Sequence, residues 1–117
     1  MFDSACIFCR IIRGELPAEI IYKNDSSLVI KDKFPKSEIH WLAIPTTHHI
    51  ADLRVITETD QMMLGSAVYA AAHAVKEFAN NRPFKLIANN GHEAGQRIFH
   101  LHFHILIGSA IEEISAV

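Results

Sequence analysis

The chain has 117 residues, 50% of them hydrophobic and 21% charged, and this length and composition predict one domain over residues 1–117 and exclude a disordered chain. Its formal net charge of −2 gives no basic surface for sequence-independent contact with nucleic acid, so we expect no nucleic-acid partner. The N-terminus lacks a signal-peptide pattern and no stretch approaches the roughly 18 apolar residues of a membrane span, which predicts a soluble, cytoplasmic protein with no membrane partner.

The first third of the chain predicts a short helix followed by a hairpin. Residues 4–13 form the helix, for which Ser4 is the expected N-cap and Gly14 the stop. The strands cover residues 19–23 and 28–31. The tetrapeptide between them, Asn-Asp-Ser-Ser, is rich in turn formers, which favours a tight connection.

The rest of the chain predicts three strands and one long helix. A third strand covers residues 39–44 and ends before Pro45. Apolar residues at helical spacing predict a helix from about residue 57 to residue 80, opened by a weak capping box. Residues 84–89 and 98–107 are the last two strands. No repeat or linker interrupts this order, which indicates an α+β fold.

The third strand and the long helix both have two distinct sides. On the strand, His40, Leu42 and Ile44 share one face, while Trp41 and Ala43 share the other. The helix carries many Ala, Gly and Ser residues, which allow close approach to a neighbour. We expect that neighbour to be the chain's own sheet, and contact with a second subunit is the alternative.

The most informative stretch is the last strand, where three histidines alternate with apolar residues. Successive side chains of a strand point to opposite faces, so His100, His102 and His104 share one face. The opposite face holds the apolar residues Phe99, Leu101, Phe103, Ile105 and Ile107. A row of imidazoles is costly to bury without partners. The row therefore predicts a metal site or a catalytic cleft.

Two features near the histidines favour phosphate chemistry over a catalytic metal ion. The stretch contains no Asp or Glu, which hydrolytic metal sites built on His-x-His generally use as a further ligand or base. The preceding loop supplies Gly91 and Gly95, where backbone N–H groups can approach an anion closely. A plain hairpin loop explains the two glycines about as well, so this interpretation rests mainly on the histidines.

The pair Cys6 and Cys9 is the second group of residues that carries chemistry. At this spacing on a helix both sulfurs lie on one side, which is typical of a redox pair or of half a zinc site. Tetrahedral zinc needs two more ligands, and His48 and His100 are the best donors available. A redox pair of the thioredoxin type would follow a strand, which this pair does not. We therefore expect zinc, with a pair of core cysteines as the alternative.

Together these residues resemble the histidine triad superfamily, in its branch of nucleotide-binding purine nucleoside phosphoramidases. The resemblance is carried by CIFCRIIRGELPA at residues 6–18, Asp32, His40, AIP at 43–45, His48, Asn89, Gly95-Gln96 and HLHFHIL at 100–106. It implies a five-stranded antiparallel sheet with one long and one short helix. It also implies a homodimer whose sheets join across the interface.

The resemblance implies that the protein is an enzyme with His102 as its nucleophile. His102 would attack the α-phosphorus of an AMP-like purine nucleotide, and water would hydrolyse the nucleotidyl-histidine intermediate. A carbonyl that accepts from the Nδ1–H of His102 would leave Nε2 free to attack. The other implied roles are phosphate contacts for His104, Gln96, Asn89 and the Gly95 amide, support of the histidines by His40, ribose contact for Asp32, and a base slot of Phe8, Ile11 and Ile30.

The resemblance also implies structural zinc and no catalytic metal. The implied zinc ligands are Cys6, Cys9, His48 and His100, so the first histidine of the row would serve stability. The histidines without an implied role, which we expect to be ordinary surface or partly buried residues, are His49, His73 and His92.

Three other functions stay open. Arg97 stands where relatives often have Ser or Thr near the leaving group, and the tail after Ile107 lacks the aromatic end that some relatives have, so dinucleoside polyphosphates are alternative substrates. A metal-dependent enzyme would place all three histidines on one ion. A non-catalytic nucleotide-binding module would need Asp32 and the base slot but no nucleophile.

Overall fold

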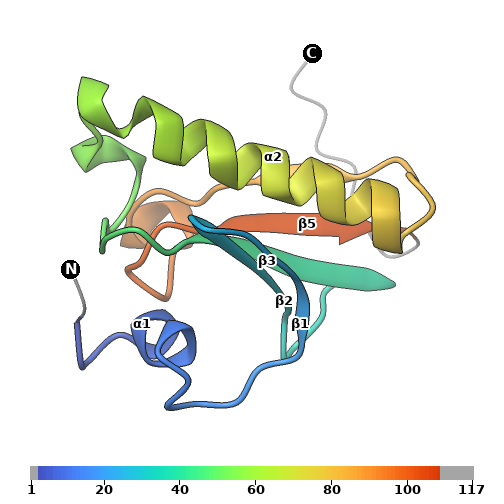
Figure 1. Ribbon diagram of the computed structural model, residues 1–117, viewed down its shortest axis with the longest axis horizontal. Coiled ribbons are helices and arrows are strands. Elements are labelled where there is room, and N and C mark those ends of the chain that lie inside the picture. Colours follow the sequence, from blue (N-terminus) through green and yellow to red (C-terminus); the bar gives the residue numbers. More distant parts are fainter. Residues whose placement is uncertain (1–2, 109–117) are drawn as a thin grey trace.

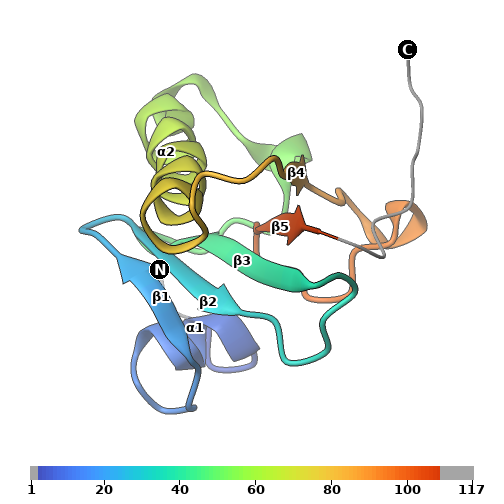
Figure 2. The same ribbon diagram turned by 90° about the vertical axis from the view of Figure 1, so that its right-hand side faces the viewer.

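The protein is described by a computed structural model that covers residues 3–108, so the tail beyond Gly108 lies outside the described residues. Its strands form one antiparallel sheet in the order β1-β2-β3-β5-β4, with the bounds β1 Ile20–Lys23, β2 Ser27–Lys31, β3 Ile39–Pro45, β4 Lys85–Ile87 and β5 Phe103–Ile107. The long helix α2 (Gln61–Phe78) lies along one face of the sheet, and the short helix α1 (Ile7–Ile12) lies on the opposite side (Figure 1, Figure 2). The predicted α+β fold is confirmed. No helix within residues 3–108 is long and apolar enough to cross a membrane.

Each face of the sheet is covered by its own apolar cluster. The cluster beneath α2 includes Trp41 and Ala43 of β3, as the alternation predicts, together with the buried alanines of α2. The cluster beneath α1 includes Leu42 and Ile44 from the other face of β3. The small residues of α2 let the helix approach the sheet closely, because Ala67, Ala70, Ala71 and Ala74 are fully buried.

Both helices begin later than the sequence predicts. Cys6, not Ser4, is the N-cap of α1, because its sulfur accepts the Cys9 N–H at 3.3 Å. Helix α1 then stops before Gly14, whose φ of +79° suits glycine. A 3₁₀ turn, η2 (Glu58–Asp60), precedes α2, and the Thr57 and Asp60 side chains form the predicted capping box there.

The strand that carries the histidines is shorter than predicted. Strand β5 starts at Phe103, so of the three histidines only His104 lies inside the sheet. The ladder between β3 and β5 ends at Ala43 and Phe103, two residues before Pro45, which has no N–H to donate. The Leu101 N–H instead donates to the Ile50 carbonyl at 2.6 Å. His100 and His102 therefore lie in an irregular segment before the strand, which frees their rings to face different partners.

The apolar half of that alternation largely holds. Leu101, Phe103, Ile105 and Ile107 are all buried in the cluster beneath α2. Phe99 is the exception, since 48% of it is exposed. The irregular segment before β5 turns this residue outward, so the face predicted from strand geometry does not extend to it.

Candidate functional site

One backbone hydrogen bond holds the ring of His102 and determines which ring nitrogen carries the proton. Its Nδ1 lies 2.7 Å from the His100 carbonyl oxygen, and a carbonyl only accepts, so the proton sits on Nδ1. The lone pair of the neutral ring is then on Nε2. This is the arrangement expected from the sequence for a nucleophilic imidazole.

A second pair of imidazoles, His40 and His104, lies beside it. His40 Nδ1 accepts the Lys36 backbone N–H at 3.0 Å, so the proton of neutral His40 is on Nε2. That Nε2 lies 2.9 Å from His104 Nδ1 and 3.3 Å from Asp32 Oδ2. When His40 donates to His104, the proton of His104 is on Nε2, which makes His104 a donor next to His102, whose ring centroid is 5.0 Å away.

These hydrogen bonds also bear on metal binding by Asp32, His40 and His104. Their ligand atoms lie within 4.8 Å of one another, close enough to share an ion. However, a metal on His40 Nε2 would move the ring proton to Nδ1, where it would oppose the Lys36 N–H. The donor pattern therefore suits a hydrogen-bonded relay better than a metal centre.

Burial keeps the site histidines neutral. It lowers the pKa of His102 from its ordinary value of 6.5, and it lowers that of His104 to about 4, helped by the neighbouring His102 and His40. Burial also lowers the pKa of His40, although Asp32 opposes this. Neutral imidazoles near pH 7 match the proton positions given by the hydrogen bonds.

The loop before the histidines is braced from within. Gln96 is 2% exposed, its Oε1 accepts the Gly91 N–H at 2.8 Å, and its Nε2 donates to the carbonyls of Ala51 and Ile98 at 2.7 and 3.0 Å. The side-chain amide of Gln96 thus already has partners within the protein, and its contact with phosphate stays a prediction. The sequence did not reveal this structural role of Gln96, because one of its partners, the Ala51 carbonyl, lies 45 residues earlier in the chain.

Two other predicted residues of this loop lie together. Asn89 Nδ2 donates to the Ala94 carbonyl at 2.9 Å, and Gly95 has a φ of +98°. A Cβ at Gly95 would lie 3.5 Å from that Asn89 nitrogen. Arg97 is exposed and donates from Nη1 to the carbonyls of His92 and Gln96, at 3.2 and 3.0 Å. These two hydrogen bonds hold the positively charged Arg97 guanidinium against the loop.

The predicted base-slot residues belong to one cluster beneath α1. Phe8 and Ile30 are both 3% exposed, and Ile11 packs against them while partly exposed. The ring of Phe8 meets His102 edge to face, with the centroids 5.0 Å apart. Asp32 and His40 also line a cavity of about 600 Å³ at the adjoining edge of the sheet.

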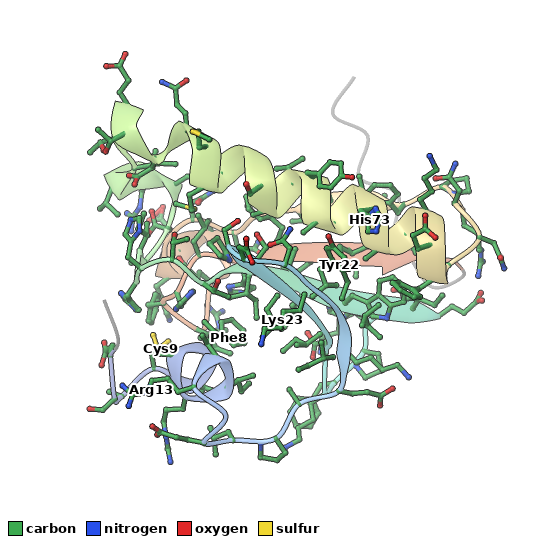
Figure 3. The ribbon with its side chains drawn as sticks, viewed as in Figure 1. Phe8, Cys9, Arg13, Tyr22, Lys23 and His73 are labelled. Atoms are coloured by element: carbon green, nitrogen blue, oxygen red, sulfur yellow. The ribbon has the colours of Figure 1, made fainter. Side chains whose placement is uncertain are left out.

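A second centre, built from sulfur and nitrogen, lies behind the nucleophile. His100 Nε2 lies 2.9 Å from the Pro45 carbonyl and must donate to it, so Nδ1 bears a lone pair. That atom faces the sulfurs of Cys6 and Cys9 at 3.4 and 3.5 Å. Figure 3 shows Cys9, like Phe8, on the side of α1 that is turned toward the sheet.

The fourth member of this centre differs from the prediction. Cys6, Cys9, His100 and His49 place their ligand atoms within 4.8 Å of one another. His48 instead faces Asp60, with Nε2 3.2 Å from Oδ1. The chain bends at residues 47–48, and the fold turns His49 toward the sulfurs and His48 toward Asp60, which the sequence did not reveal. Two thiols and two imidazoles are a donor set that fits tetrahedral zinc.

The fold and the site together define a class: a small α+β protein that presents one desolvated, neutral imidazole beside a hydrogen-bond donor and an apolar slot. Comparison with known proteins agrees. The family described as scavenger mRNA decapping enzyme C-term binding matches residues 5–113. An uncharacterized HIT-like protein of Synechocystis sp. is 40% identical over 102 residues, which cover 87% of this chain and 89% of that protein. The chain belongs to the histidine triad (HIT) superfamily.

Other relatives carry more specific names. Adenylylsulfatase HINT3 of Arabidopsis thaliana is 38% identical over 104 residues, which cover 86% of this chain but 51% of that protein. A HIT family hydrolase from Clostridium thermocellum superposes with a TM-score of 0.88 at 35% identity, over 96% of this chain and 97% of the other. A Zn-bound histidine triad family protein from Mycobacterium smegmatis gives a TM-score of 0.73 at 31% identity, over 87% and 73%.

Proposed function

We propose that this protein is a nucleotide hydrolase that cleaves purine 5′-phosphoramidates and related nucleotidyl compounds to AMP. The observation that carries this proposal is the 2.7 Å bond from His102 Nδ1–H to the His100 carbonyl, which leaves the Nε2 lone pair for attack. The names of the HIT family hydrolase and of adenylylsulfatase HINT3 support hydrolysis at a nucleotidyl phosphorus.

The reaction proceeds in two displacements. His102 Nε2 attacks the α-phosphorus, an N–P bond forms, and the leaving group departs with the electron pair of its bond to phosphorus and takes up a proton from water. A second water then attacks the phosphorus and gives up a proton to the solvent, the N–P bond breaks, and AMP leaves with His102 regenerated. The Nε2–H of His104 donates to a phosphate oxygen, where negative charge develops. His40 keeps that proton in place through its 2.9 Å contact with His104.

The remaining residues bind the nucleotide. Asp32 accepts from the ribose hydroxyls with its partly exposed carboxylate, while one oxygen still accepts the Phe34 N–H at 2.8 Å. Asn89 and the Gly95 amide contact the phosphate, and the Gly95 N–H exchanges its 3.0 Å bond to the His92 carbonyl for this contact. The purine packs on Ile11, which is the partly exposed member of the cluster it shares with Phe8 and Ile30. An apolar slot of this kind recognises the flat base mainly by area.

Structural zinc accompanies this function. Cys6, Cys9, His49 and His100 would hold it, and bound zinc supplies only a link between α1 and the segment before β5. The zinc-bound relative from Mycobacterium smegmatis supports such a site. No catalytic metal is proposed, because the hydrogen bonds among His40, His104 and Lys36 already occupy the second cluster.

A homodimer is the proposed assembly. Three residues on the outer side of α2 are apolar and exposed, namely Met62, Val68 and Tyr69 at 86%, 40% and 61%, and Leu86 on the edge strand β4 is 36% exposed. A second copy that covers this surface would join the two sheets through β4. Light scattering during gel filtration should give twice the mass of one chain, and a single-chain mass would contradict the dimer.

Turnover and binding in His102→Ala test the proposed reaction. Adenosine 5′-phosphoramidate should be hydrolysed to AMP by the wild type, and the variant should lose at least about 10³-fold in rate while still binding AMP. His92→Ala, at an exposed histidine outside the site, is the matched control and should behave as wild type. Adenylyl sulfate and diadenosine polyphosphate, assayed in parallel, identify the preferred leaving group. If His102→Ala keeps its activity, the proposed nucleophile is wrong.

A further inference from the structure

One side chain, Phe8, connects the sulfur centre with the nucleophile. It lies between Cys6 and Cys9 in the sequence and is 3% exposed. Its ring stands edge to face against both His102 and His100, with centroid distances of 5.0 and 5.9 Å and interplanar angles of 75° and 84°. The same helical turn therefore supplies two sulfurs to the centre and one ring to the nucleophile.

The contact matters because, within residues 3–108, one hydrogen bond holds the His102 ring. A single hydrogen bond sets the tautomer only while the ring keeps the orientation in which Nδ1 reaches the His100 carbonyl, and a ring that turns away can adopt either tautomer. Phe8 packs against the ring, and the ring of His104 meets it at 5.0 Å and 64°. Both rings contact His102, and of the two Phe8 comes from outside the histidine segment.

The position of Phe8 depends in turn on what anchors α1. This helix has six residues, too few to be stable alone. Its N-cap sulfur, Cys6, is itself a member of the four-residue centre with Cys9, His49 and His100. An ion held by these residues would fix the N-terminal turn of α1 to the segment that carries His102.

We propose that Phe8 is a positioning residue through which the Cys6, Cys9, His49 and His100 centre holds the His102 ring in its attacking orientation. This inference rests on the proposed function and deepens it. The structural centre and the reaction are then coupled, although no metal takes part in the chemistry. Phe8 is almost fully enclosed by the cluster beneath α1 and by the rings of His100 and His102, so the purine meets the partly exposed Ile11 instead.

The test compares Phe8→Leu with Ile12→Leu. Leucine keeps position 8 apolar but removes the aromatic edge, and Ile12 packs against the same cluster from the same helix but carries no aromatic ring. Four quantities are measured: bound zinc, kcat and KM for adenosine 5′-phosphoramidate, and the tautomer of His102 from two-bond ¹H–¹⁵N correlation of the histidine rings. Wild type is measured both zinc-loaded and after chelation, with circular dichroism to confirm that it stays folded.

Phe8→Leu should keep its zinc, show a mixture of His102 tautomers, and lose about tenfold to a hundredfold in kcat with KM nearly unchanged. Zinc-free wild type should show the same mixture, and Ile12→Leu should match the zinc-loaded wild type. The proposal is overturned if the His102 signals of Phe8→Leu equal those of the wild type, or if that variant loses its zinc. A wild type that shows one His102 tautomer but no turnover would refute the proposed function alone.

Discussion

The low pKa of His104 predicts a specific loss of stability in mild acid. In the folded chain this pKa lies at about 4, mainly because the ring is buried, with further lowering by His102 and His40 and an opposing effect of Asp32. In the unfolded chain the ring returns to 6.5. Between these values the unfolded state binds a proton that the folded state does not, so the free energy of unfolding decreases as the pH falls. The stability that the neutral His104 ring contributes above pH 6.5 is lost as the pH falls to about 4.

The size of this loss in stability follows from the difference between the pKa of His104 in the unfolded chain and in the folded chain. At about 1.4 kcal/mol for each pH unit, the complete loss is at most about 3.5 kcal/mol, and about 2 kcal/mol of it has appeared near pH 5. Partial exposure of the ring to water lowers both figures. Even so, about 2 kcal/mol is a large part of the stability of a small domain.

Urea unfolding of wild type and His104→Gln near pH 7.5 and near pH 5 measures this effect. Glutamine keeps a polar side chain but does not titrate, so the wild type should lose up to about 2 kcal/mol more than the variant between the two pH values. His92→Gln, at an exposed position, is the control and should follow the wild type. Parallel curves for wild type and His104→Gln would refute the assignment of His104 as a buried neutral imidazole.

Three further predictions concern the loop and the ribose contact. Gly91→Ala should lower the free energy of unfolding in urea by about 1–3 kcal/mol, because φ is +97° and the new Cβ would lie 3.0 Å from the Arg54 guanidinium carbon. Gly65→Ala has open space around the new Cβ and should raise this free energy by roughly 0.5–1 kcal/mol. Equal effects of the two substitutions would refute the strain at residue 91. Gln96→Met should cost about 2–3 kcal/mol in the same assay, since it leaves buried partners unpaired, and an unchanged midpoint would show that this brace contributes nothing. Asp32→Asn should weaken AMP binding about tenfold in calorimetry, and undiminished affinity would remove Asp32 from the ribose site.

The sequence was informative wherever side-chain period and local chemistry agree. The alternation on β3 separated Trp41 and Ala43 from Leu42 and Ile44, and each pair is buried in a different cluster. The capping box at Thr57 and the stop at Gly14 are local signals, and both occur as predicted. The spacing of Cys6 and Cys9 placed both sulfurs on one side of a helix, where they meet His100.

Tertiary structure decided the features that depend on distant partners. Pro45 lacks the N–H that would extend the β3–β5 ladder, so His100 and His102 leave the strand pattern that the alternation predicted. The choice of His49 over His48 depends on how the chain turns after β3, and the position of the Gln96 side chain depends on the carbonyl of Ala51, 45 residues earlier. Side-chain period and secondary-structure propensity depend on neighbours along the chain. They identified which residues carry the chemistry, but not the distant groups that those residues contact. The proton lies on His102 Nδ1 because the His100 carbonyl accepts it in the folded chain. The pKa of His104 is low because folding buries its ring beside His102 and His40.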